Sequence, residues 1–190
     1  MHEGGTMKTI LFMVCVVTIS GFISAQGKAV HFKKLQEFLP STDLPGFDRK
    51  RPSGQTQTNM GMTTSEAKVR YVTKQVEQTN DVEAAMEPEQ TIEVSISDFA
   101  GIPYGQMAMM AYQGEFENET EDGYEKSISV NKIYKGKESM HTGDYKNCSL
   151  EVAVGNRFLV KIEAQNTDDV KLLHTIVNSM NLAGLEKATP

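Results

Sequence analysis

The stretch "CSLEVAVGNRFLVKIEAQ", residues 148–165, contains two alternating segments joined by a Gly155–Asn156 pair. Side chains on a β-strand point alternately to opposite faces, so this period of two predicts two strands that each bury one face. A glycine–asparagine pair accepts the positive φ values of tight hairpin turns. The stretch therefore predicts a β-hairpin. Its apolar positions are Leu150, Val152 and Val154 before the turn, and Phe158, Val160 and Ile162 after it.

The same alternation recurs upstream of this hairpin. We expect strands at residues 65–76, 91–99, 124–130 and 132–141, which makes about six strands with the hairpin. Short polar turns join several of them, and strands joined in this way pair antiparallel. The acidic segment 77–90 is expected to be a loop or a short frayed helix.

Three segments have helical periodicity or helix signals. We expect an N-terminal helix that ends before Pro40, a short methionine-rich helix over residues 103–113, and a C-terminal helix that begins after Asn166 or Thr167 and ends near Gly184. The fold class is therefore α+β, with a single antiparallel sheet and the three helices covering one face. The C-terminal helix is expected to bury Leu172, Leu173, Ile176, Val177 and Met180.

The chain divides into three regions. Residues 1–25 are expected to be a signal peptide, residues 26–62 an N-terminal helix followed by an extended Pro/Gly-rich segment, and residues 63–187 the sheet domain. Cys148 is the single cysteine after position 25 and is in phase with Leu150. We therefore expect a buried, unpaired thiol.

The N-terminal segment has the features of an export signal. Lys8 precedes an apolar run of about fourteen residues, which is shorter than the roughly twenty needed for a membrane span. Small residues follow the run, and we place the cleavage site after Ala25. The remaining domain is expected to be periplasmic or extracellular, with no stable membrane span. The net charge of −6 argues against a nucleic-acid partner.

Four stretches, "LQEFLPSTDLPGF", "SGQTQTNMGMTTSEAKVRY", "IEVSISDFAG" and "LEVAVGNRFLVKIEAQN…LLHTIVNSMNLAGL", cover most of the mature chain. Together they resemble a group of exported bacterial proteins of unknown function. Shared features are an "LP…GF" segment, an "S.A...Y" strand, an "I.D" strand, a "V.NRF.V" hairpin and a final helix. The arrangement is also similar to the PsbP-like fold, an antiparallel sheet flanked by helices. The resemblance implies a fold and no catalytic residues.

Catalytic motifs are sparse in this sequence. It has no glycine-rich phosphate loop, no GxSxG, no HExxH and no CxxC. One hypothesis is an enzyme whose site is assembled from scattered residues. Its candidates are Asp98, Asp122, His141 and Arg157, and they would have to meet in one concave pocket.

The methionine-rich stretch "GQMAMMAYQGEF", residues 105–116, offers three interpretations. Its methionines fill the core, with the Met107–Met110 face against the sheet; or they form an adaptable surface for a partner or an apolar ligand; or they bind Cu(I). The copper hypothesis would also draw on Met60, Met62 and the Met140–His141 pair. No cofactor or resident metal is expected.

The leading functional hypothesis is a noncatalytic extracytoplasmic domain that binds a partner protein or a small apolar ligand. An enzyme with an unrecognised site is the alternative, and copper binding is a weaker one. The candidate contact residues are Met107, Met109, Met110 and Tyr112.

The export signal gives the first testable prediction. Protein recovered outside the cytoplasm should begin at Gln26, because the apolar run is followed by small residues that signal peptidases accept. N-terminal sequencing of the exported form checks this. Recovery of membrane-bound protein that retains residues 10–25 would contradict it.

Overall fold

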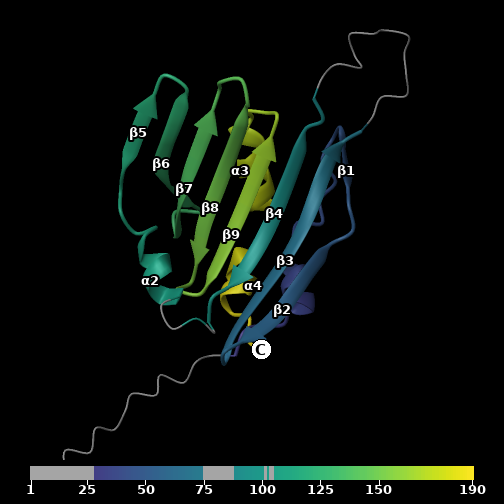
Figure 1. Cartoon of the computed structure of the whole chain (residues 1–190), viewed down its shortest axis with the longest axis vertical. Coiled ribbons are helices and arrows are strands. Elements are labelled where there is room, and N and C mark those ends of the chain that lie inside the picture. The colour runs from purple at the N-terminus through teal and green to yellow at the C-terminus, as the bar shows by residue number, and fades with distance from the viewer. Residues whose placement is uncertain (1–27, 75–87, 101, 103–104) are drawn as a thin grey trace, which may run out of the picture.

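The computed structural model describes residues 28–74, 88–100, 102 and 105–190. Across these residues the chain forms one nine-stranded antiparallel sheet with short helices (Figure 1). The strands are β1 (Phe47–Arg49), β2 (Ser53–Asn59), β3 (Met62–Thr73), β4 (Thr91–Asp98), β5 (Glu117–Thr120), β6 (Gly123–Val130), β7 (Tyr134–His141), β8 (Asn147–Val154) and β9 (Phe158–Gln165). The helices are α1 (Phe32–Leu35), the 3-10 helix η1 (Gln36–Phe38), α2 (Gly105–Met110), α3 (Val170–Ser179) and α4 (Leu182–Glu186).

The strand order is β1-β3-β4-β9-β8-β7-β6-β5, and β2 also pairs with β3. The predicted α+β class with a single antiparallel sheet is confirmed, but the expected number of about six strands was too low. The strands that the sequence did not reveal are β1, β2 and β5. All three lie at the margins of the sheet and are mostly exposed, so they lack the alternating apolar pattern that identifies a buried strand.

The predicted hairpin forms the middle of the sheet. Leu150 pairs with Ile162 and Val154 with Phe158, in the register that the apolar alternation requires. Gly155 has φ of +54° in the connecting turn, a conformation that favours glycine. On the other side of β9, β4 continues the same pattern with Val94 opposite Ile162.

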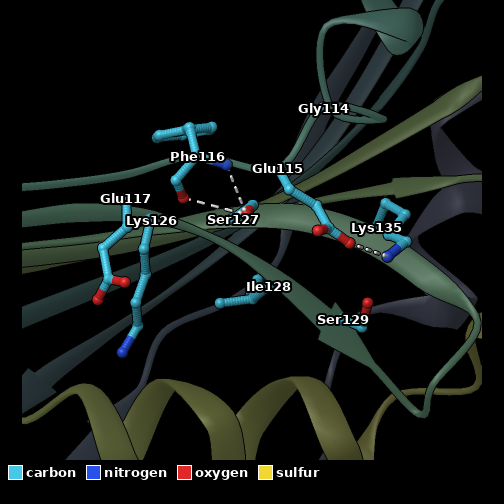
Figure 2. Close-up of a pocket in the computed structure, with 9 residues that line it drawn as sticks. All are labelled: Gly114, Glu115, Phe116, Glu117, Lys126, Ser127, Ile128, Ser129 and Lys135. Atoms are coloured by element: carbon cyan, nitrogen blue, oxygen red, sulfur yellow. Dashed lines mark hydrogen bonds and ion pairs between the residues drawn. The ribbon is translucent and has the colours of Figure 1, made fainter.

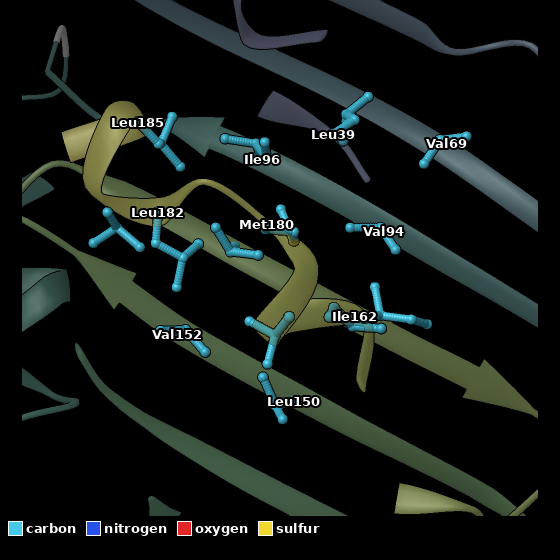
Figure 3. Packing of buried hydrophobic residues seen from close by; sticks show 14 of the residues in the cluster. Leu39, Val69, Val94, Ile96, Leu150, Val152, Ile162, Met180, Leu182 and Leu185 are labelled. Atoms are coloured by element: carbon cyan, nitrogen blue, oxygen red, sulfur yellow. The ribbon is translucent and has the colours of Figure 1, made fainter. Parts of the chain in front are cut away.

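The apolar side chains of these central strands meet the helices in one core, shown from close by in Figure 3. Leu150 and Ile162 are fully buried on the sheet, and Leu173 and Leu185 are fully buried on α3 and α4. At the β2 margin of the sheet, the Phe32 ring of α1 packs against Gly54. A Cβ atom added to Gly54 would lie 2.9 Å from that ring. The N-terminal and C-terminal helices therefore share one face of the sheet, as expected.

The C-terminal helix differs from its prediction in two respects. Its cap is Asp169, whose side chain accepts a hydrogen bond from the Leu172 N–H at 3.2 Å. Gly184 does not end the helix, because α3 stops at Ser179 and a second helix, α4, includes Gly184. Asn181 caps α4 through the Gly184 N–H at 2.9 Å, which explains the new start.

The predicted signal peptide and most of the predicted 77–90 loop lie outside the described residues. In the part of the chain that is described, no helix is both long and apolar enough to cross a membrane.

Cys148 lies on β8 and is 1% exposed, which confirms the buried thiol expected from its phase with Leu150. Burial raises the pKa of the thiol to about 12, with a smaller contribution from the negative charges of Asp169, Asp168 and Glu138. The thiolate is the reactive form of cysteine. The thiol is therefore both inaccessible and protonated in the folded protein.

In the chain that begins at Gln26, Cys148 should resist a thiol reagent while folded and react once the chain is unfolded. Its replacement by Ser should cost about 1–3 kcal/mol of unfolding free energy, since the hydroxyl would be buried among apolar groups. Labelling with and without denaturant, followed by mass spectrometry, measures the first effect. Equal labelling rates in the two states would show that the strand is open in solution.

Candidate functional site

The strands β5 and β6 lie beyond the helical layer (Figure 1). The contacts of α3 are concentrated on β8 and β9, and those of α4 on β8 and η1. All four residues of β5 are exposed, and most of β6 is half-buried. We call β5, β6, α2 and the connecting residues 111–116 the β5–β6 wing. It contains the candidate contact residues that the sequence suggested.

The α2 helix buries a different methionine from the one expected. Met109 is 1% exposed, whereas Met107 and Met110 are 64% and 68% exposed. Successive residues of a helix are about 100° apart, so Met107 and Met110 share one side and Met109 lies on the other. The expectation that the Met107–Met110 face packs on the sheet is therefore wrong. That face is presented to solvent.

Tyr112 attaches the residues after α2 to the sheet. Its hydroxyl donates to Glu151 Oε2 at 2.7 Å, and Glu151 is also 3.6 Å from the Nζ atoms of both Lys137 and Lys161. Burial, the hydrogen bond and the charge of Glu151 raise the pKa of Tyr112 well above its usual value, so the phenol remains a donor. Glu151 neighbours Leu150 in the strand and so points to the opposite face from the core. The methionine-rich segment therefore does not share the helical face, contrary to expectation.

A groove of about 470 Å³ lies where this segment enters β5 (Figure 2). Phe116 pairs with Ser127 through three hydrogen bonds: the Ser127 N–H to the Phe116 carbonyl at 2.8 Å, the Phe116 N–H to Ser127 Oγ at 3.0 Å, and Ser127 Oγ to the same carbonyl at 3.1 Å. Glu115 lies 3.9 Å from Lys135 across the groove. The lining residues are Gly114 to Glu117, Lys126 to Ser129, and Lys135.

Sequence reasoning missed this groove. The segment "ENETEDG" has the composition of a polar turn, although its first four residues form β5. The signal that could have found it is the alternation of Glu115, Glu117, Glu119 and Glu121, a period of two made by charge in place of apolar residues.

A cluster of polar side chains centred on Glu138 includes two residues of β6 and lies on the helical face of the sheet. The Glu138 side chain is 4% exposed. Its Oε1 accepts from the Tyr124 hydroxyl at 2.5 Å and lies 3.4 Å from Lys126 Nζ, and its Oε2 is 2.5 Å from His174 Nε2. Burial alone would raise the pKa of Glu138, but these hydrogen bonds and positive charges outweigh burial and lower it.

The Glu138 cluster was not anticipated either, because its members come from β6, β7 and α3. Both carboxylate oxygens of Glu138 are occupied by groups of the protein itself, and no buried side-chain nitrogen or oxygen within the described residues lacks a hydrogen-bond partner. Burial, together with the Glu138 hydrogen bond and charge, raises the pKa of Tyr124 and keeps that phenol protonated. The cluster connects the wing to α3, and its member Lys126 also lines the groove.

The four candidates for a catalytic site form two separate pairs. Asp98 Oδ1 and Oδ2 accept from Arg157 Nε and Nη2 at 2.9 and 2.8 Å, and Asp98 is buried. Its oxygens also accept the backbone N–H groups of Val30 at 2.6 Å and Ala100 at 2.9 Å. This set of bonds attaches the N-terminal segment to the ends of β4 and β9.

The other pair lies at the opposite end of the sheet. His141 of β7 is opposite Gly123 in β6 and Asn147 in β8. Asn147 in turn pairs with Gln165, the last residue of β9, whereas Arg157 precedes the first residue of that strand. The Asp122 carbonyl accepts from the Thr142 N–H at 2.8 Å, beside His141. The length of the central strands separates this pair from Asp98 and Arg157, so the four residues do not form one site.

The methionines of the copper hypothesis are also dispersed. Met60 lies in the β2–β3 turn and is 91% exposed, and Met62 is the first residue of β3. Tyr112 holds the segment after α2 to β8, which is three strand positions from β3, or about 14 Å. In the described ranges, no three His, Cys, Asp or Glu side chains are grouped as metal ligands.

Comparisons of the chain with protein-family models, with curated proteins and with solved structures find no match.

The two methionine environments in α2 give a matched pair of variants. Met109→Ala should lower the unfolding free energy by about 2 kcal/mol or more, because it removes a buried side chain, whereas Met110→Ala should change it by less than about 0.5 kcal/mol. Denaturant unfolding of both variants measures this difference. Thermal melts under reducing conditions should show no response to Cu(I). A copper-induced rise in Tm that Met110→Ala abolishes would instead support thioether ligation.

Proposed function

We propose that the protein is a noncatalytic, exported binding domain that takes a partner polypeptide at the β5–β6 wing. The observation that carries this proposal is the groove of about 470 Å³ that Phe116 and Ile128 line, together with the exposed methionines that precede it in the same segment. Met107, Met110 and Phe116 are 64%, 68% and 41% exposed. Flexible methionines and an aromatic ring are well suited to contacts with a partner.

The lining of the groove favours a polypeptide over a small apolar ligand. It combines charged side chains with the apolar groups of Phe116 and Ile128, and a peptide offers both kinds of contact. The space between the sheet and the helices, the other place for an apolar ligand, is occupied by a continuous cluster of buried side chains. A ligand there would have to displace packed core residues.

The geometry of the ionisable groups supports a binding role more than a catalytic one. Asp98 and Glu138 are the buried carboxylates of the described chain, and both are saturated by hydrogen bonds and ion pairs within the protein. A general acid or base needs a free position within hydrogen-bond distance of a substrate. The enzyme hypothesis would require another site.

A selection from random peptides tests the proposal, because it requires no candidate partner. Phage-displayed peptides are selected on the mature chain, and the affinity of enriched peptides is measured by fluorescence anisotropy. Met107→Lys/Met110→Lys and Ile128→Lys should each weaken binding about tenfold, which corresponds to about 1.4 kcal/mol. Met60→Lys is the matched control, because Met60 is also an exposed methionine but lies at the β2–β3 turn.

Circular dichroism of each variant must show the fold of the parent protein. Enrichment no greater than that on an unrelated folded domain would overturn the proposal. So would peptides whose affinity is unaffected by the wing variants or equally reduced by Met60→Lys.

A further inference from the structure

Among the residues that the structure describes, the outer edge of β5 carries backbone groups that no other strand pairs with. The hydrogen bond from the Ser127 N–H to the Phe116 carbonyl fixes which residues face β6. Because backbone direction alternates along a strand, Asn118 and Thr120 also face β6, and Glu117 and Glu119 direct their N–H and C=O groups away from it. Strand β5 is the last in the strand order, so these groups lie at a free edge.

The side chains along this edge have a regular charge pattern. Glu117 is opposite Lys126 and Glu119 is opposite Tyr124, so both glutamates lie on the helical face of the sheet. Glu115 and Glu121 continue the alternation on either side, and all four residues are exposed. In the described chain the one ion pair among these four is the 3.9 Å contact of Glu115 with Lys135.

We propose that β5 accepts an extended segment of a partner protein as an added antiparallel strand, with lysine or arginine at every second position. This rests on the proposed function and identifies the form of the polypeptide that the β5–β6 wing binds. The residues that form hydrogen bonds to Glu117 and Glu119 lie directly opposite them, so their side chains share the face of the two carboxylates. A cation at those positions gives a favourable cross-strand pair.

The opposite face of β5 determines the intervening positions. Phe116, Asn118 and Thr120 alternate with the glutamates and therefore point away from the helical face. Phe116 is 41% exposed at the end of β5 next to the groove. An apolar side chain is thus expected opposite Phe116 and small polar ones beyond it.

The charge pattern also selects against other occupants. Charged side chains on an edge strand prevent pairing with a strand of the same charge, so two β5 edges repel one another. A neutral strand would leave the glutamates without partners. Among the described strands, the basic edge is β1, which ends at Arg49 two residues before Arg51, but β1 has three residues and the Arg49 Nε already donates to the Pro40 carbonyl at 3.1 Å. We therefore assign the edge to a different protein.

The test uses an acetylated, amidated peptide, Thr-Lys-Thr-Lys-Val-Lys-Thr, added to the isotope-labelled mature chain at low ionic strength, where surface charges are least screened. Binding should slow amide hydrogen exchange at Glu117 and Glu119 by about tenfold or more, because their N–H groups become hydrogen-bonded. Glu117→Gln/Glu119→Gln should weaken binding about tenfold. Glu37→Gln/Glu163→Gln makes the same change in net charge at exposed positions away from β5 and should have little effect.

A second peptide separates strand addition from simple charge attraction. Methylation of the backbone nitrogens of its three lysines keeps every side-chain charge. It removes the backbone N–H groups that would bond to β5, so binding should be lost. Equal binding of the methylated peptide, or unchanged exchange at Glu117 and Glu119, would overturn the proposal. Concentration-dependent self-association that is abolished by Arg49→Gln/Arg51→Gln would assign β5 to a second copy of this chain and would also overturn it.

The outcome is distinguishable from a failure of the proposed function. If selected peptides bind the β5–β6 wing but lack alternating basic residues and leave the Glu117 and Glu119 amides unprotected, the binding function stands and strand addition is wrong. If no selected peptide binds the wing, both are wrong.

Discussion

The helices cover one face of the sheet only at its central strands, and the rest of the structure depends on this constraint. The contacts of α3 and α4 with the sheet are concentrated on β8 and β9, whereas the sheet is eight strand positions wide, or about 34 Å, because β1 and β2 both pair with β3. The core therefore forms where β4, β9 and β8 carry uninterrupted apolar alternation. The strands outside this region need another source of stability.

Polar interactions replace apolar burial at the β5–β6 wing. On the helical face Glu138 connects Tyr124 and Lys126 of β6 to His174 of α3. On the other face Glu151 accepts a hydrogen bond from the Tyr112 hydroxyl and forms ion pairs with Lys137 and Lys161. Paired charges and satisfied hydrogen bonds allow a sheet to continue beyond its helices without exposing unpaired buried groups. They also leave side chains at the edge available to a partner, as the proposed function requires.

The buried carboxylates, which are the usual candidates for catalytic groups, form hydrogen bonds and ion pairs within the protein. Asp98 receives four hydrogen bonds from Arg157, Val30 and Ala100, which close the end of the sheet where the N-terminal segment joins it. Removal of one member of such a buried pair leaves a charge without compensation. The Asp98 carboxylate therefore stabilises the fold. This structural role supports a proposed function that uses the surface of the protein and not its buried carboxylates.

The sequence by itself determined the central architecture. Alternation around Leu150, Val152, Val160 and Ile162 was sufficient for the hairpin, its register and the burial of Cys148, because a shift of one residue would expose every apolar side chain. The antiparallel sheet and the two terminal helices followed from the same periodicities. Local pattern decides these features because burial of one face is encoded residue by residue.

Only the tertiary structure decided the margins of the sheet and the candidate site. The strands β1, β2 and β5 pair through backbone groups and have polar sequences, so no apolar period marks them. The choice of Met109 over Met110 as the buried methionine depends on how α2 is attached through Tyr112 to a strand nearly forty residues later in the chain. Glu138 and His174 are likewise 36 residues apart in the sequence and are brought together by the packing of α3 on the sheet. Contacts between distant segments depend on strand order, and strand order is a property of the whole chain.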